Sequence, residues 1–167
     1  MLFRSDTTPA IDQLAARAVR FHRAYATAPW TIPSVASMIT GRYPSNHTAI
    51  SFDRSLPDGV DTLAEILERE DYATAGVISH RAIGSSHNFQ QGFDVYLESE
   101  ARGHDHVSTE GVTRQAVDLL ETLSAAGQPF FLFVHYFDPH YNYKRHPEYG
   151  FAGPSAGRLD EIGRAHV

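Results

Sequence analysis

Thr31 stands at the beginning of an expected helix, where a hydroxyl group could act as a nucleophile. Pro33 suits the first turn of a helix because proline has no N–H to lose there, and Gly41 suits the left-handed cap at its end. The unpaired N–H groups and the positive dipole of that first turn would hold a sulfate or phosphate group. A threonine hydroxyl is a weak nucleophile, so this chemistry also calls for a metal ion. The alternative is that Thr31 only caps the helix.

His140 follows the second informative stretch, the apolar run 130–134 and a turn that contains Asp138 and Pro139. Such a run is typical of a strand covered on both faces in a parallel sheet, and ligands bind at the carboxyl edge of such sheets. Since the pKa of histidine lies near neutral pH, His140 could donate to a substrate oxygen or protonate a leaving group. The alternative is a surface histidine in a loop. We expect His135 to pack at the end of the strand.

Helices that alternate with apolar strands position these residues and predict an α/β fold. Apolar residues at helical spacing, together with proline and glycine at the ends, predict four helices. Short apolar or alternating runs predict three strands, and a polar stretch that follows Gly84 and contains two more glycines predicts a long loop. The expected helices are 9–18, 33–41, 63–71 and 112–127, the strands are 19–25, 73–79 and 130–134, and the loop is 85–105.

The composition excludes several classes of site. The chain has 167 residues, 42% of them hydrophobic and 20% charged, which is enough for one domain with a sizeable core. Its net charge of -6 argues against nucleic acid as the main partner. The absence of cysteine excludes disulfides, thiolate metal sites and a cysteine nucleophile. No apolar run is long enough for a membrane span, and we assign no cellular compartment.

The segment 28–44 resembles the sulfatase signature, in which Cys or Ser, any residue and Pro-Ser-Arg precede a small-residue helix, Thr-Gly and Tyr-Pro. The matching residues are Thr31, Pro33, Ser34, Thr40, Gly41, Tyr43 and Pro44.

Asp138, Pro139 and His140 are similar to the Asp-Pro-His that follows a strand in this family, where the histidine contacts the sulfate or phosphate group. The segment 88–96 resembles the family's Gly-Phe-Asp stretch, in which we expect Asp94 to be structural. The family's Gly-Lys-Trp-His element is absent, and His80 is the candidate substrate-binding residue in its place.

This resemblance implies part of a three-layer alkaline-phosphatase-like fold with a mainly parallel sheet covered by helices. It also implies a metal-dependent hydrolase of sulfuric or phosphoric esters, in which Thr31 is both nucleophile and metal ligand. Two departures from the signature are Thr31 itself, in place of Cys or Ser, and Val35, in place of Arg. Both argue against a formylglycine mechanism. They favour, as an alternative, a phosphoethanolamine- or glycerol-phosphate-type transferase. A non-catalytic anion-binding module is a further alternative.

The family binds its divalent metal (Ca, Mg, Mn or Zn) through one acidic pair near the first strand and through a distant Asp-Asn or Asp-His pair. Thr31 is the one ligand that the resemblance carries onto this chain.

Residues 2–5 and 162–167 resemble translations of the two strands of a sequencing adapter, so we expect 1–5 and 161–167 to be non-native. We therefore expect a partial sulfatase domain at 6–160 and an inactive isolated polypeptide. The expected substrate is a small-molecule, glycan-linked or lipid-linked sulfate or phosphate ester.

Overall fold

The structure is a computed structural model that describes residues 9–103, 106, 108–138 and 140. The chain divides into two compact units, one made of Met1–Tyr25 with Asp138–Val167 and the other of Ala26–Phe137. Within its described residues, the first unit contains helix α1 (Pro9–Ala15). All other described elements belong to the second unit. The predictions for residues 1–5 and 161–167 lie outside the described residues.

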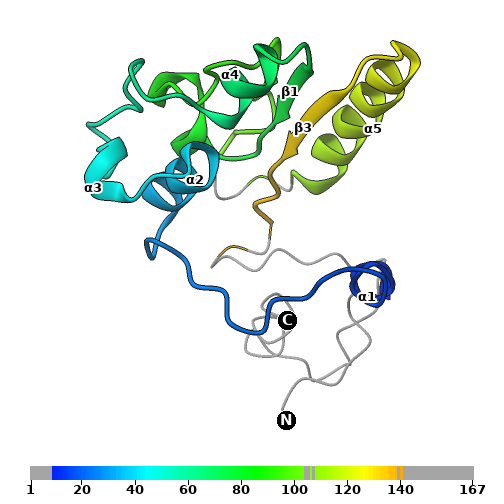
Figure 1. Ribbon diagram of the computed structural model, residues 1–167, viewed down its shortest axis with the longest axis horizontal. Coiled ribbons are helices and arrows are strands. Elements are labelled where there is room, and N and C mark those ends of the chain that lie inside the picture. Colours follow the sequence, from blue (N-terminus) through cyan, green and yellow to red (C-terminus); the bar gives the residue numbers. More distant parts are fainter. Residues whose placement is uncertain (1–8, 104–105, 107, 139, 141–167) are drawn as a thin grey trace. The chain divides into compact units, whose positions relative to one another are not determined.

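A three-stranded parallel sheet is the centre of the second unit (Figure 1). Strand β1 (Ala73–Val77) lies between β2 (Val95–Leu97) and β3 (Phe130–Val134). Each pairing is parallel, with Ala75 opposite Val95 and Ala73 opposite Phe130. Parallel neighbours require crossover connections, and the long helix α5 (Thr109–Ala125) provides the one into β3, against which it packs. The expected α/β class is therefore confirmed.

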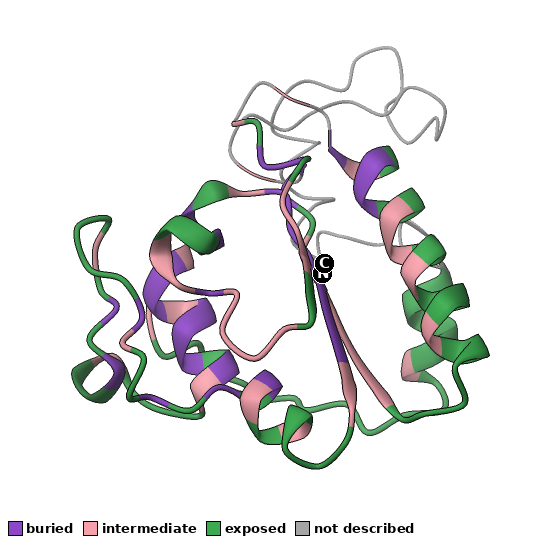
Figure 2. Ribbon diagram, turned by 90° about the horizontal axis from the view of Figure 1, so that it is seen from above, coloured by how far each residue is buried: buried purple, intermediate pink, exposed green. Residues whose placement is uncertain are grey.

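Helix α2 (Thr31–Thr40) supplies the largest part of the core on the other side of the sheet from α5 (Figure 2). Its residues 32, 35, 36 and 39 recur at helical spacing and are all buried, so one face of the helix is fully covered. The core cluster consists of Ile32, Val35, Ala36, Ile39, Ala49, Leu56, Ile78, Ala82, Ile83, Phe89 and Ala101. This burial fixes where α2 begins relative to the ends of the strands.

Short elements connect α2 to the sheet. Helix α3 (Pro44–His47) follows α2, and α4 (Leu63–Glu68) precedes β1. Two 3₁₀ turns, η1 (Arg81–Ile83) and η2 (Ser85–His87), lie between β1 and β2. Helix α2 packs against α3, α4 and η1. The start of α2 and the segment after β1 therefore share one packed layer.

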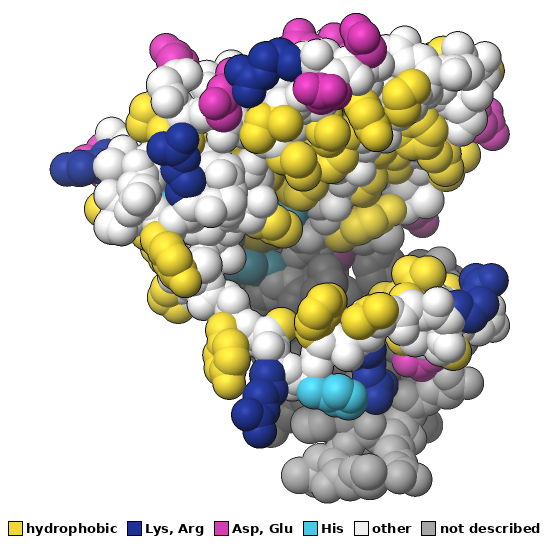
Figure 3. Space-filling view, viewed as in Figure 1, with side chains coloured by type: hydrophobic (Ala, Val, Ile, Leu, Met, Phe, Trp, Pro, Cys, Tyr) yellow, Lys and Arg dark blue, Asp and Glu magenta, His cyan; other side chains and the backbone are white. Residues whose placement is uncertain are grey.

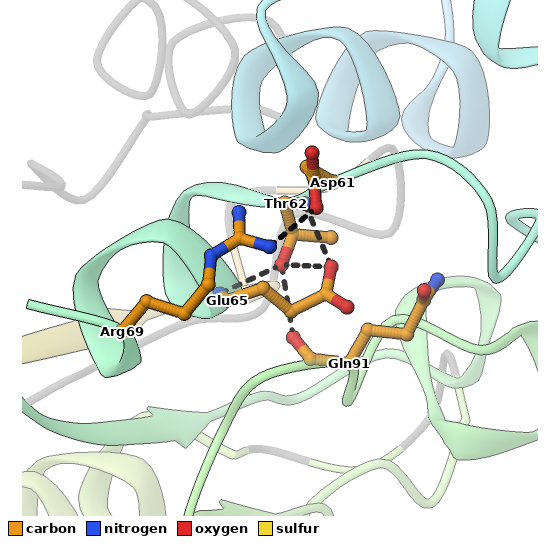
Figure 4. A network of polar contacts seen from close by, with 5 residues as sticks. All are labelled: Asp61, Thr62, Glu65, Arg69 and Gln91. Carbon is orange, nitrogen blue, oxygen red and sulfur yellow. Dashed lines mark hydrogen bonds and ion pairs between the residues drawn. The ribbon is translucent and has the colours of Figure 1, made fainter.

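A capping box fixes the start of α4 (Figure 4). The Thr62 hydroxyl accepts from the backbone N–H of Glu65 at 3.1 Å, and the N–H of Thr62 donates to the Glu65 carboxylate at 2.8 Å. The Thr62 hydroxyl also lies 3.1 Å from the carbonyl of Gln91, in the segment before β2. Arg69 and Asp61 form an exposed ion pair across the same helix. These contacts tie α4 to the loop that leads into β2.

The helices predicted at 63–71 and 112–127 and the strand at 73–79 are confirmed as α4, α5 and β1, with slightly different ends. Helix α2 begins at Thr31, two residues before the expected first residue Pro33, and ends as predicted at Gly41 with φ 64°. The strand predicted at 19–25 is wrong. Its apolar side chains are exposed, and it has no ladder partner among the described residues, without which an extended segment does not become a strand.

Two predictions about the sheet need correction. The segment 85–105 is not a continuous loop, because it contains η2 and the strand β2. Strand β3 is not covered on both faces, since all five of its residues are only half-buried.

Figure 3 shows hydrophobic side chains gathered at the surface between α4 and α5. Leu63 and Ile66 of α4 and Val117 and Leu120 of α5 are each more than a third exposed. No helix among the described residues is long and apolar enough to cross a membrane.

Candidate active site

Thr31 occupies the first helical position of α2, and its side chain does not cap the helix. The N-cap is Trp30, in an extended conformation with φ −149° and ψ 169°, and no side chain caps this end. The carbonyl of Trp30 accepts the first intrahelical bond, from the N–H of Ser34 at 3.2 Å. The Thr31 hydroxyl is half-buried and makes no hydrogen bond within the described part of the chain. The capping alternative for Thr31 is therefore not what the structure shows.

The first turn of α2 presents two N–H groups without a backbone partner. The N–H groups of Thr31 and Ile32 donate to no acceptor among the described residues, and Pro33 has no N–H at all. Two donors and the positive end of a ten-residue helix therefore belong to the turn that carries Thr31. An oxyanion bound there would receive hydrogen bonds from the same turn that carries the nucleophile.

A buried hydrogen bond between His47 and Ser37 joins α3 to α2. His47, the last residue of α3, is fully buried, and its Nδ1 accepts from the N–H of Ala49 at 3.2 Å. The other ring nitrogen, Nε2, therefore carries the proton of the neutral ring and donates to the Ser37 hydroxyl at 3.0 Å. Burial lowers the pKa of His47, with the backbone carbonyl of Pro33 opposing this in part. No sequence pattern indicates this role, because His47 is one of ten histidines and its partner is a serine on a different helix.

His80 lies at the carboxyl end of β1, as the N-cap of η1. Its Nδ1 accepts from the N–H of Ala82 at 3.2 Å, so the neutral ring carries its proton on Nε2. The imidazole stacks on Phe137, with the ring centroids 4.2 Å apart and the planes inclined by 25°. Because Phe137 follows β3, this contact brings the carboxyl ends of β1 and β3 together. Ala82 and Ile32 belong to one core cluster, so the segment after His80 packs on the helix of Thr31.

His135 and Asp94 have structural surroundings, as expected. The Ser79 hydroxyl donates to the backbone carbonyl of His135 at 2.8 Å, and burial lowers the pKa of the His135 imidazole. The carboxylate of Asp94 accepts from the backbone N–H of Thr74 at 2.8 Å, and this contact joins the start of β2 to β1. Among the described residues, no hydrogen bond joins either side chain to the first turn of α2.

His140 and Asp138 belong to the first unit, whereas Thr31 and His80 belong to the second. The structure thus assembles the helix of Thr31 and the segment of His80 within a single unit. His140 is half-buried and Asp138 is buried. The catalytic role of His140 therefore stays a prediction.

The described residues do not provide the donor set of a metal site. No group of three or more histidine, aspartate or glutamate side chains able to hold an ion occurs among residues 9–103, 106, 108–138 and 140. A hard divalent cation needs several converging oxygen ligands, and the Thr31 hydroxyl is a single neutral one. The expected metal does not fit the described residues by themselves.

Known proteins show similarity along most of the chain. A family model described as Sulfatase matches residues 3–158. Iduronate 2-sulfatase from Homo sapiens is 28% identical over 178 aligned residues, which cover 85% of this chain and 32% of the relative. The chain thus spans about a third of the length of this curated relative.

Solved structures show the same fold. The structure of BT4656 in complex with its substrate D-glucosamine-2-N,6-O-disulfate has a TM-score of 0.70 at 22% identity, over 84% of this chain and 31% of that one. A protein of the alkaline phosphatase superfamily from Vibrio parahaemolyticus has a TM-score of 0.72 at 24% identity, over 96% of this chain and 42% of that one. The expected alkaline-phosphatase-like fold is therefore confirmed.

Proposed function

Because this chain belongs to the sulfatase family, we propose that the protein hydrolyses sulfuric esters with Thr31 as its nucleophile. The observation that carries the proposal is the first turn of α2. There, an uncapped hydroxyl lies in the same turn as two N–H donors without partners, those of Thr31 and Ile32. Sulfated sugars are the proposed substrates, since iduronate 2-sulfatase and the BT4656 complex carry sugars in their names.

The proposed reaction uses residues of this chain in two steps. The N–H groups of the first turn bind the sulfate oxygens, and the Thr31 Oγ1 attacks the sulfur. The bond from sulfur to the leaving alcohol breaks, and His140 passes the threonine proton to the departing oxygen. Water then attacks the sulfated threonine and releases hydrogen sulfate and the free hydroxyl. His80 is proposed to donate from Nε2 to a sulfate oxygen.

A divalent metal is proposed for the protein as a whole, where it would neutralise charge on the sulfate group.

A second candidate function is the transfer of a phospho group to an alcohol. Thr31 and Val35 favour it, because they stand where the sulfatase signature has Cys or Ser and Arg. Such an enzyme would hold a phosphothreonine at position 31 and pass the group to an acceptor hydroxyl instead of water. A third candidate, an anion-binding module without turnover, would need only the N–H groups of the first turn.

Replacing Thr31 by alanine and by serine separates these functions. The protein is assayed for release of sulfate from a panel of sulfated sugars, and of phosphate from the matching phosphate esters. Thr31→Ala is expected to lower kcat by about 1000-fold or more and Thr31→Ser to retain measurable turnover, because serine keeps the hydroxyl. Thr27→Ala, at an exposed position four residues earlier, is the matched control.

The outcomes identify one function each. Turnover of sulfate esters that Thr31→Ala leaves intact would refute the proposed nucleophile. Faster reaction of phosphate esters, with a phosphorylated peptide around Thr31, would support the transferase instead. Sulfate binding that Thr31→Ala leaves unchanged, without turnover of any ester, would leave only the anion-binding module.

A further inference from the structure

Trp30, which immediately precedes Thr31, forms a cluster of aromatic rings with Phe52 and the half-buried His87, and we call these three residues the ring patch. The rings of Trp30 and Phe52 have centroids 5.5 Å apart at an angle of 49°. Phe52 meets His87 edge to face at 5.9 Å. Trp30 is 38% exposed and Phe52 is 65% exposed, although both are large apolar side chains. Clustered exposed aromatic rings commonly mark a binding surface.

Hydrogen bonds hold the ring patch in place. The N–H of Leu56 donates to the carbonyl of His87 at 2.9 Å, which ties the segment of Phe52 to η2. The Nε2 of His87 lies 3.2 Å from the carbonyl of Phe52, which can only accept, so Nε2 is the donor. The Nδ1 of the same ring lies 3.0 Å from the Ser86 hydroxyl. Phe52 is therefore presented to solvent by an ordered segment.

The turn that carries Phe52 also carries polar groups. The N–H of Arg54 donates to the carbonyl of Ser51 at 3.1 Å and closes the turn, and the Ser51 hydroxyl donates to the Asp53 carboxylate. This hydrogen bond lowers the pKa of Asp53, so its carboxylate is charged at neutral pH. A turn that carries an exposed ring, a carboxylate and a guanidinium at three successive positions, 52 to 54, suits a ligand that has both an apolar face and hydroxyl groups.

The ring patch begins at the residue next to the proposed nucleophile. Trp30 is covalently adjacent to Thr31 and is the N-cap of the helix whose first turn would hold the sulfate group. The sulfate group of an ester is bonded directly to its alcohol part, so a sulfate at this turn places the alcohol part within reach of Trp30. Phe52 extends the same surface by one further ring.

The geometry points to the ring patch as a subsite for the sugar ring that carries the sulfate ester. The inference rests on the proposed function for the sulfate position, and it adds residues that recognise the leaving group. The C–H face of the sugar packs on Trp30 and Phe52, and its hydroxyls bond to the polar groups of the 51–54 turn.

Binding to the ring patch has a direct optical readout. Trp30 is the single tryptophan of the 167-residue chain, so its emission, excited at 295 nm, reports on the patch alone. Glucosamine 6-sulfate, methyl sulfate and phenyl sulfate are titrated separately into the full chain. We expect a saturable change of emission with glucosamine 6-sulfate and at least several-fold weaker binding of the other two. Phe52→Ala is expected to weaken binding of the sugar sulfate by about 3- to 10-fold, as for the loss of one aromatic contact.

The control variant is Tyr43→Ala, which removes an aromatic side chain of similar size that is 70% exposed and forms no ring contact with the patch among the described residues. Equal affinities for methyl sulfate and glucosamine 6-sulfate would overturn the inference, as would tighter binding of phenyl sulfate. The same holds if Phe52→Ala binds the sugar sulfate as tightly as Tyr43→Ala.

The inference and the proposed function can fail separately. Sugar binding that depends on Phe52 without turnover of any ester would support the subsite and remove the hydrolase. Turnover that depends on Thr31 but not on Phe52 would support the hydrolase and remove the subsite.

Discussion

Removal of the Ser37 hydroxyl tests whether the buried pair behind Thr31 holds α2 in place. Ser37 lies on the buried side of α2 and accepts from the Nε2 of His47 at 3.0 Å. In Ser37→Ala the imidazole stays fully buried, and its Nε2–H loses the acceptor. His47 cannot turn its ring to recover the bond, because its Nδ1 is held by the N–H of Ala49.

The expected cost follows from leaving a buried donor unsatisfied. Such a group destabilises a protein by about 1–3 kcal/mol, more than the net value of an exposed hydrogen bond. We therefore expect the free energy of unfolding of Ser37→Ala to fall by about 2 kcal/mol. For a chain of 167 residues that corresponds to a Tm lower by about 4–8 °C. Urea unfolding followed by circular dichroism at pH 8, where His47 is neutral in both states, measures this difference.

The matched control is Ser45→Ala, which removes a serine hydroxyl that bonds to Asn46 at the exposed surface of α3. It is expected to change the free energy of unfolding by less than about 0.5 kcal/mol. Equal effects of the two substitutions would refute the reasoning. They would mean that the Nε2–H of His47 finds another acceptor, for which the nearby carbonyl of Pro33 is the available group.

The remaining predictions concern titration, packing and backbone conformation. Burial lowers the pKa of His47 and His135 in the folded state, so the unfolded state binds protons first, and the free energy of unfolding should fall as the pH drops below about 6.5. Urea unfolding at several pH values checks this, and stability that rises between pH 7 and 5 would contradict it. Gly76→Ala should destabilise the protein by about 2 kcal/mol or more, because the added Cβ would lie 2.5 Å from the ring of Tyr96. That ring cannot easily move, since its hydroxyl donates to the carbonyl of Ile83. Urea unfolding unchanged by the substitution would disprove the close packing. Thr48→Gly should stabilise the protein by about 1 kcal/mol, since a β-branched residue is held there at φ 58°; a lower Tm would count against strain at this position.

Much of the fold was predictable from local patterns. The apolar spacing of α5, the capping residues of α4 and the left-handed glycine after α2 each act within a few residues, so their signals are readable in the sequence. Strand β3 and its place in a parallel sheet were also predicted, because an apolar run after a long helix is typical of such a strand, but its pairing with β1 was not.

The errors have one physical cause, which is that strands depend on distant partners. Residues 19–25 alternate like a strand but have no ladder neighbour among the described residues, and β2 is only three residues long and pairs with a segment about twenty residues away. The half-burial of β3 depends on what covers it, and its own sequence does not contain that information. Pairing and cover are tertiary properties.

The same division holds for the candidate site. The sequence by itself determined that Thr31 stands at a helix start within a sulfatase-like pattern, because both the helix signals and the pattern are contiguous. Only the tertiary structure decided three features of the site. The Thr31 hydroxyl does not cap the helix, His47 is hydrogen-bonded to Ser37 of α2, and the ring of Phe52 packs against that of Trp30. These contacts join residues ten or more positions apart or depend on the backbone angles at a helix end. Such relations arise from packing in three dimensions, which local residue patterns do not specify.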